Sequence, residues 1–180
     1  MMPKYTLIAL GFFFSLWAGG EWKEFVSYDG KFRVSVPGEL ELRSKQIETA
    51  IGEISYHTFV LQPDEDASDN LVYMVSYCDY PKGAVHSDST DLLSDFFETT
   101  VETAVSSVEG ELRYTTPIEL RDYPGRLWRI DYNDGEAIIK SKCYLVGHRF
   151  YSLQAITVKD RSLNPSMDKF FDSFELLEKE

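Results

Sequence analysis

Two cysteines and three histidines are the side chains in this sequence best suited to covalent or metal chemistry. They are Cys78, Cys143, His57, His86 and His148. A thiol beside an imidazole makes a nucleophile pair, and imidazoles that converge with a carboxylate bind zinc. The histidines fall in a predicted strand, a loop and a turn, and the cysteines in two predicted strands. Nothing in this pattern brings them together, so we predict no catalytic residue, no metal site and no cofactor.

Local catalytic motifs are missing as well. The sequence has no G-x-S-x-G, no phosphate-binding glycine loop, no H-E-x-x-H and no C-x-x-C. The segment DYNDGE at 131–136 has its glycine fifth, where a calcium loop needs it sixth, and no glutamate stands at position twelve. We interpret it as a turn. The acidic loop 64–70 leaves weak calcium binding open, although a solvated loop is the simpler interpretation.

Tyrosines and arginines near the ends of predicted strands are better candidates for binding. Both residue types favour protein interfaces, and loops commonly carry function. We predict a binding patch made of Tyr80, Tyr123, Arg126 and Arg149. The alternative is that each of these side chains only closes its own turn.

The two cysteines leave two interpretations open. In an exported protein, an even pair such as Cys78 and Cys143 is compatible with a disulfide. Both residues lie within predicted strands, where they would equally serve as buried thiols. The sequence alone does not place them within bonding distance.

The first half of the chain predicts strands followed by one long helix. Alternating patterns predict strands at 32–36 and 52–61, and an apolar run predicts a central strand at 71–80. A helix follows, with Ser89 or Thr90 as its cap and Gly110 in the left-handed turn that ends it. Its apolar stripe consists of Leu92, Leu93, Phe96, Phe97, Val101, Ala104, Val105 and Val108.

The second half predicts a strand at 111–120, with Pro117 favouring a sheet edge, and a type II turn at Tyr123–Arg126. Strands at 126–132 and 136–146 then flank a turn at 133–135. The glycine-first turn Gly147-His148 sets Val146 opposite Arg149. One face of that hairpin then carries Tyr144, Val146, Tyr151, Leu153 and Ala155, and the other Ile139, Leu145, Phe150 and Ile156. A short helix near Asn164-Pro165 places Met167, Phe170, Phe171 and Phe174 on the sheet.

The composition and the first 20 residues limit which partners and which location we expect for the protein. The chain has 180 residues and a formal net charge of −12, which repels phosphate backbones and so disfavours nucleic acid as a partner. Residues 1–20 have one charge, Lys4, then an apolar run and a small-residue exit, which predicts a signal peptide cleaved after Gly20. An uncleaved membrane anchor, which needs about 20 apolar residues, is the alternative. We expect residues 21–180 to form one domain with no membrane span, in the periplasm or outside the cell.

Several phrases in order resemble a family of exported bacterial proteins with a PsbP-like fold. They are "GKFRVSVPGEL" at 30–40, "VYMVSYCDYP" at 72–81, "DYPGRLWRI" at 122–130, "YLVGHRFYSL" at 144–153 and "FFDSFELL" at 170–177. The resemblance implies an α+β fold, a central antiparallel sheet with helices packed on both faces. The photosystem II extrinsic protein and a nuclear-import factor share that architecture and act by docking on other proteins. No residue set in this sequence matches either docking surface.

These observations predict a non-enzymatic exported domain that binds a protein or a cell-envelope component. The alternative is a small-ligand carrier or a hydrolase-like enzyme that uses a pocket between the sheet and a helix. A deep pocket with converging carboxylates or Arg126 would favour that alternative, and a flat surface over a filled core would count against it.

Overall fold

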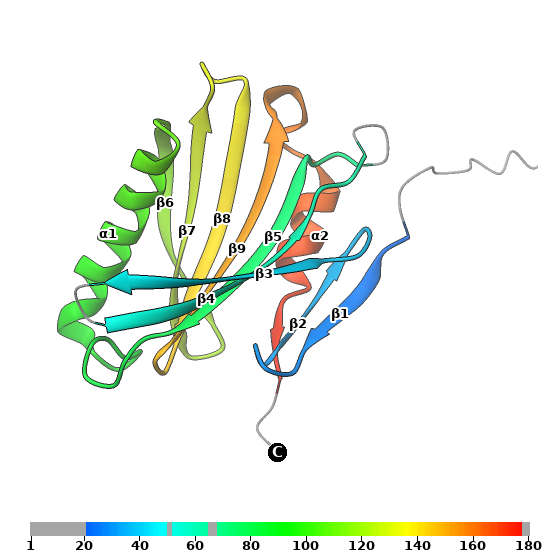
Figure 1. Cartoon of the computed structure of the whole chain (residues 1–180). Coiled ribbons are helices and arrows are strands. Elements are labelled where there is room, and N and C mark those ends of the chain that lie inside the picture. The colour runs from blue at the N-terminus through cyan, green and yellow to red at the C-terminus, as the bar shows by residue number, and fades with distance from the viewer. Residues whose placement is uncertain (1–20, 50–51, 65–67, 178–180) are drawn as a thin grey trace, which may run out of the picture.

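Seven antiparallel strands form the main sheet of the computed structural model, which describes residues 21–49, 52–64 and 68–177 (Figure 1). Across the sheet they run β3 (Glu41–Thr49), β4 (Gly52–Leu61), β5 (Val72–Asp79), β9 (Arg149–Val158), β8 (Ala137–Val146), β7 (Tyr123–Tyr132) and β6 (Glu111–Leu120). A smaller antiparallel sheet has the order β1 (Lys23–Ser27), β2 (Phe32–Val36) and β10 (Glu175–Leu176). The predicted signal segment, 1–20, lies outside the described residues.

Two α-helices accompany the sheets, α1 (Thr90–Ser107) and α2 (Pro165–Asp172), with a 3-10 turn η1 (Lys159–Arg161) before α2. Figure 1 shows α1 beside β6 and β7, whereas α2 lies on the side of β1 and β2. No helix in the described residues is long and apolar enough to cross a membrane.

The predicted fold class was wrong. Strands hold 52% of the described residues and helices 19%, so the protein is mostly β. The sequence predicted an α+β fold, one central sheet with helices packed on both faces. Instead there are two sheets, and the smaller one faces the main sheet on the side away from α1. The prediction failed because some strands lack an alternating apolar pattern that would identify them in the sequence. Strand β3 (ELRSKQIET) is a polar, exposed edge, and β10 has two residues.

Alternate side chains of the main sheet enter two separate hydrophobic cores. The core between the sheets is rich in aromatic rings and includes Phe32, Tyr73, Tyr151, Phe170 and Phe174. The core under α1 includes Phe97, Val101, Trp128, Ile130, Leu145 and Phe150. Because both faces are covered, the central strands are apolar on both sides, which their sequences had indicated.

The hairpin of β8 and β9 confirms the register that the sequence predicted. Val146 pairs with Arg149, Tyr144 with Tyr151, and Cys143 with Ser152. Gly147 has a φ of +61°, as a glycine-first hairpin turn requires. The two predicted faces separate as expected, one into each core.

Helix α1 covers the main sheet through the predicted stripe, with Phe97 and Val101 buried and Leu92 exposed. Ser89 occupies the N-cap position, but its side chain makes no capping hydrogen bond. The predicted left-handed turn at Gly110 was wrong, because Glu109 adopts it, with a φ of +50°. A Cβ at Gly110 would lie 2.4 Å from Cγ2 of Ile130, so glycine allows the chain to pass close to β7.

Helix α2 begins as predicted. Pro165 is its first residue, and the side chain of Asn164 accepts a hydrogen bond from the backbone N–H of Met167 at 2.7 Å. Met167, Phe170, Phe171 and Phe174 are all buried in the core between the sheets.

The predicted type II turn at Tyr123–Arg126 was wrong, because these residues begin strand β7. The chain reverses three residues earlier, where Arg121 has a φ of +56° and Leu120 pairs with Tyr123. Pro124 fits in the strand because pairing with β8 begins only at Gly125, so no N–H is needed on that side. Strand β6, which carries Pro117, is an edge of the main sheet, as predicted.

Candidate functional site

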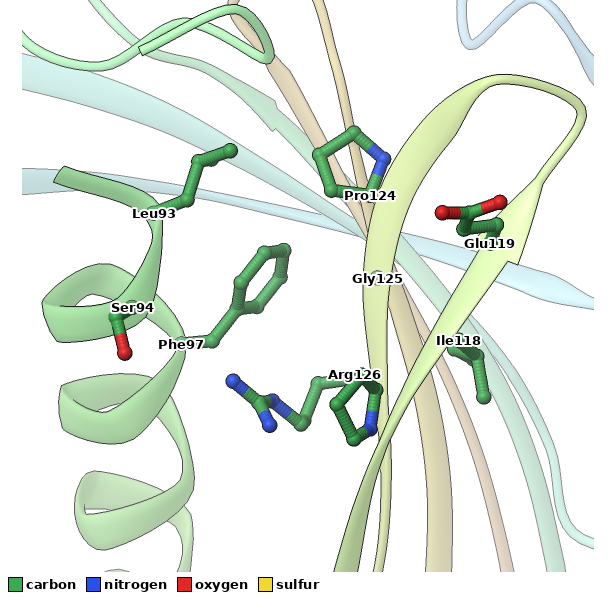
Figure 2. Close-up of a pocket in the computed structure, with 9 residues that line it drawn as sticks. Leu93, Ser94, Phe97, Ile118, Glu119, Pro124, Gly125 and Arg126 are labelled. Carbon is green, nitrogen blue, oxygen red and sulfur yellow. The ribbon is translucent and has the colours of Figure 1, made fainter. Parts of the chain in front are cut away.

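The first two turns of α1 and the neighbouring ends of β6 and β7 enclose a pocket of about 530 Å³. We call it the Arg126 pocket. Its lining residues are Leu93, Ser94 and Phe97 from α1, Pro117, Ile118 and Glu119 from β6, and Pro124, Gly125 and Arg126 from β7. Figure 2 shows the helix residues facing Pro124 and Arg126 across the opening. The volume lies within the range of sites that bind small ligands.

The strand alternation of β7 turns Arg126 toward the helix. Arg126 pairs with Cys143 on β8 and Pro117 on β6, and Cys143 belongs to the core under α1. Gly125 points the other way, where its missing side chain leaves room for Tyr144. A Cβ there would lie 2.3 Å from the Cys143 carbonyl oxygen and 2.5 Å from Cδ1 of Tyr144. The floor of the pocket is therefore held closely against β8.

Arg126 differs from every other arginine in the described residues. Each of the others donates at least one side-chain hydrogen bond. The Arg126 guanidinium has no hydrogen bond or ion pair to a described residue, and it lies over the ring of Phe97, 5.7 Å from the ring centroid. Arg126 is half-buried, and its guanidinium, with five free donors, is matched in shape and charge to a carboxylate.

The rest of the lining is mainly apolar. The Ser94 hydroxyl donates to Glu98 on its own helix at 3.1 Å, so it already has a partner. Glu119 is the other charged residue in the lining, and it forms no ion pair with Arg126. Figure 2 shows its carboxylate on the other side of the β7 ribbon from the guanidinium. The pocket thus offers one cation and a hydrophobic wall, which suits an anionic group attached to an apolar body.

The four predicted binding residues do not form one patch. Tyr80 lines a second cavity, on the other side of α1, and Tyr123 packs against the core between the sheets. Arg149 is engaged in an internal network, where it donates to both carboxylate oxygens of Asp79 at 2.6 Å. Of the two arginines, only Arg126 lines a pocket with a guanidinium that has no hydrogen bond to a described residue.

The Arg149 network fastens the smaller sheet to the main one. Arg149 also donates to the backbone carbonyl of Asp29 at 2.7 Å, and its guanidinium lies 4.8 Å from the centroid of the Tyr77 ring. The Tyr151 hydroxyl donates to the carbonyl of Gly30 at 2.7 Å. The hydrogen bonds from Arg149 hold the pKa of Asp79 below its ordinary value. Arg149 therefore does more than close its own turn, because it joins the β1–β2 turn to the end of β5.

Cys78 on β5 and Cys143 on β8 are buried free thiols. Strand β9 lies between their strands, so two strand spacings alone separate the Cα atoms by at least about 9 to 10 Å, beyond the roughly 7 Å limit for a disulfide. Burial raises the pKa of each thiol to about 12. At neutral pH both remain protonated, which makes them poor nucleophiles.

The histidines take separate structural roles. His57 stacks on Tyr77, with ring centroids 4.7 Å apart, and bonds Ser44. The rings of His86 and His148 lie 4.6 Å apart, a proximity that the sequence did not predict, and the ring of His148 bonds the Val85 carbonyl. Across the described residues, no three His, Cys, Asp or Glu side chains gather in a way that could hold a metal ion.

Sequence reasoning identified Arg126 but missed its surroundings. The predicted strand at 126–132 already contained the alternation of Arg126, Trp128 and Ile130, but these residues were not assigned to the face under α1, and Pro124 was placed in a turn. That period of two, extended back through Pro124, was the signal that would have paired Arg126 with the helix stripe.

Comparisons with known proteins identify the fold. No known protein family model matches the sequence, and no curated protein matches it. The solution structure of cyanobacterial PsbP (CyanoP) from Synechocystis is similar, with a TM-score of 0.58, 13% identity, and coverage of 94% of this chain and 98% of that chain. A crystal structure from Pseudomonas aeruginosa, of a protein of unknown function described as a putative regulator, has 10% identity and a TM-score of 0.37 over 79% of this chain and 86% of that chain. The likeness to CyanoP shows that this chain has a PsbP-like fold.

Proposed function

We propose that this protein is an exported, non-enzymatic binding domain whose Arg126 pocket holds a carboxylate attached to an apolar group of its partner. The observation that supports this most directly is that half-buried Arg126 lines the pocket with a guanidinium that has no hydrogen bond to a described residue. Export is supported by the signal-like segment 1–20 and is consistent with the PsbP-like fold.

The energetics favour an anion at this position. An incompletely solvated charge without a partner costs free energy, and a carboxylate that accepts two parallel N–H bonds removes that cost. The apolar walls contributed by Leu93, Phe97 and Pro124 would cover an aliphatic or aromatic group next to the carboxylate. The phosphate of a nucleic acid is a poor candidate, because the chain has a net charge of −12.

Two sources supply this chemistry. One is the carboxyl terminus of a protein chain that ends in an apolar residue, which fits a protein partner. The other is a free carboxylic acid, which fits a small-ligand carrier. We favour the protein terminus because the pocket is open to solvent at the end of the sheet, between α1 and the β6–β7 turn, where a chain end can enter (Figure 2).

Titration calorimetry distinguishes these sources. The probes are a short peptide ending in Leu-Phe with a free carboxyl terminus, the same peptide amidated, and phenylbutyrate with its neutral amide. We expect the free-acid peptide to bind and its amide to bind at least about tenfold more weakly, the loss expected for one charge-assisted interaction. Binding of phenylbutyrate in place of the peptide would assign the pocket to a small acid.

Variants locate the binding. Arg126→Gln should remove the preference for the free acid, and Arg126→Lys should restore part of it, because lysine keeps the charge without the planar fork. Arg113→Gln, at an exposed arginine of neighbouring β6, is the matched control and should bind like the wild type. Equal binding of acids and amides by the wild-type protein would contradict the proposal.

A further inference from the structure

A second cavity lies on the opposite side of α1 from the Arg126 pocket, and its volume is also about 530 Å³. We call it the Tyr80 cavity. Cys78 on β5 and Phe150 on β9 contribute its floor, and Phe96 on α1 contributes one wall. Ile47 and Ile54 contribute the other wall from the hairpin of β3 and β4, where they are cross-strand partners. The cavity therefore lies between three separate parts of the fold.

Three aromatic rings in contact make the lining of this cavity hydrophobic. The rings of Tyr80 and Phe96 meet edge to face with centroids 5.5 Å apart, and those of Phe96 and Phe150 do so at 5.7 Å. Together with Ile54 they form a hydrophobic surface of the kind that holds planar or aliphatic ligands. Most of the binding free energy would come from covering this surface.

Charge separates this cavity from the Arg126 pocket. Its lining residues include no lysine, arginine or histidine, and Asp95 is the one ionisable carboxylate among them. An anion would therefore meet a low-dielectric wall and a like charge, with no cation to compensate. The cavity excludes the class of ligand that Arg126 attracts.

Tyr80 supplies a polar group that the fold leaves free. Its backbone N–H is bonded to the carbonyl of His148 at 2.9 Å, but its hydroxyl makes no hydrogen bond to a described residue. Burial raises the pKa of Tyr80 and of Tyr56, another lining residue, above the ordinary tyrosine value. Both hydroxyls therefore keep their protons at neutral pH and are able to donate.

We propose that the Tyr80 cavity is a second binding site, which takes a neutral, largely apolar small molecule and donates the Tyr80 hydroxyl to a single oxygen acceptor on it. A ketone, an ether or an alcohol on an aromatic or alicyclic body has this chemistry. The site is independent of the carboxylate that we propose for Arg126, because the two cavities share no lining residue.

Fluorescence of a neutral probe tests the site. Prodan is an uncharged naphthalene ketone whose emission shifts to the blue in an apolar site, and the corresponding dimethylaminonaphthalene carboxylate is its anionic control. We expect saturable binding of prodan and no more than weak binding of the carboxylate. Tyr80→Phe keeps the ring and should weaken prodan roughly three- to tenfold, the value of one neutral hydrogen bond.

Blocking variants decide where the probe binds. Thr99→Trp places an indole in the cavity from an exposed position on α1 and should abolish binding. Glu102→Trp, on the same helix but outside the lining, is the matched control and should bind normally. Arg126→Gln should also leave prodan binding unchanged, which separates this result from that of the first pocket.

Cysteine labelling supplies a readout that does not depend on the variants. Cys78 lines the cavity, whereas Cys143 is equally buried but lines neither pocket. Prodan should slow alkylation of Cys78 more than that of Cys143, as measured by mass spectrometry of the labelled peptides. Equal protection of both thiols, equal binding by the two tryptophan variants, or tight binding of the carboxylate would each overturn the proposal.

Discussion

At the scale of single residues, the groups left without partners are more informative than those that are paired. Most charged side chains near the main sheet form ion pairs, as Arg129 does with Asp131 at 2.7 Å. Arg126 and the Tyr80 hydroxyl lack such partners, and each lines a cavity. The described residues also contain two fully buried polar atoms without a hydrogen bond, Nε1 of Trp128 and Oγ of Ser141. These two residues are cross-strand neighbours on β7 and β8, and neither lines a cavity.

Ser141 therefore allows a test of how much a buried hydroxyl without a hydrogen-bond partner costs in stability. Its side chain is completely buried and its hydroxyl has no partner, so Ser141→Ala removes a desolvation cost. We expect the free energy of unfolding to rise by about 1 kcal/mol in urea titration. Ser173→Ala is the contrasting control, because that hydroxyl accepts from the N–H of Ser35 and donates to the carbonyl of Phe170, both at 2.8 Å. Loss of stability in both variants would show that Ser141 is bonded.

At the scale of elements, the sequence predicted strongly patterned segments well and weakly patterned ones poorly. The hairpin of β8 and β9 was correct to the residue, because glycine fixes its turn and both faces are apolar. Strand β3 was missed, because its side chains from Glu41 to Glu48 are exposed and mostly polar and its order comes from backbone pairing with β4. Arg126 was recognised as a candidate, but the pocket depends on which helix crosses its strand. That is a contact between distant segments, and local spacing does not encode it.

A substitution at the start of β7 tests how closely β7 packs against β8. A methyl group at Gly125 would lie 2.3 Å from a backbone oxygen of β8, which a side-chain rotation does not relieve. We expect Gly125→Ala to lower the free energy of unfolding by about 2 to 3 kcal/mol. Gly38→Ala is the control, since its new methyl would meet only the flexible side chain of Leu61, at 3.1 Å. Comparable stability of the two variants in urea titration would contradict this account.

At the scale of the whole molecule, the smaller sheet is a separate layer that needs its own attachments to the main sheet. The aromatic core lies between the layers, and the Arg149 network joins the turn between β1 and β2 to the ends of β5 and β9. Within the smaller sheet, an ion pair from Arg33 to Glu175 joins β2 to β10. Because Arg149 is held by the carboxylate of Asp79, we expect acid to weaken the attachment of the smaller sheet to the main sheet.

The pH dependence follows from the lowered pKa of Asp79. Its contribution to stability is present above the ordinary carboxylate pKa of about 4 and is lost as the pH falls through the lower pKa of the folded protein. Asp79→Asn should lower stability by about 1 kcal/mol or less at pH 7, because this carboxylate is largely exposed. The difference from the wild type should shrink in strong acid, as followed by thermal unfolding at several pH values.

The control for the loss of one negative charge is a substitution at another exposed carboxylate. Asp122→Asn, at a carboxylate without an ion pair to a described residue, should leave unfolding close to that of the wild type at each pH. A constant deficit for Asp79→Asn from neutral to strongly acidic conditions would show that the ion pair with Arg149 is not what holds the layers.

The described part of the chain contains two tryptophans, and they report on opposite halves of the protein. Trp128 is buried under α1, two residues along β7 from Arg126, whereas Trp22 packs at the edge of the other core with the ammonium of Lys169 4.2 Å from its ring centroid. Replacing Trp22 with phenylalanine would leave Trp128 as the indole emitter among these residues. Its natural emission would then follow events on the helix side without a dye.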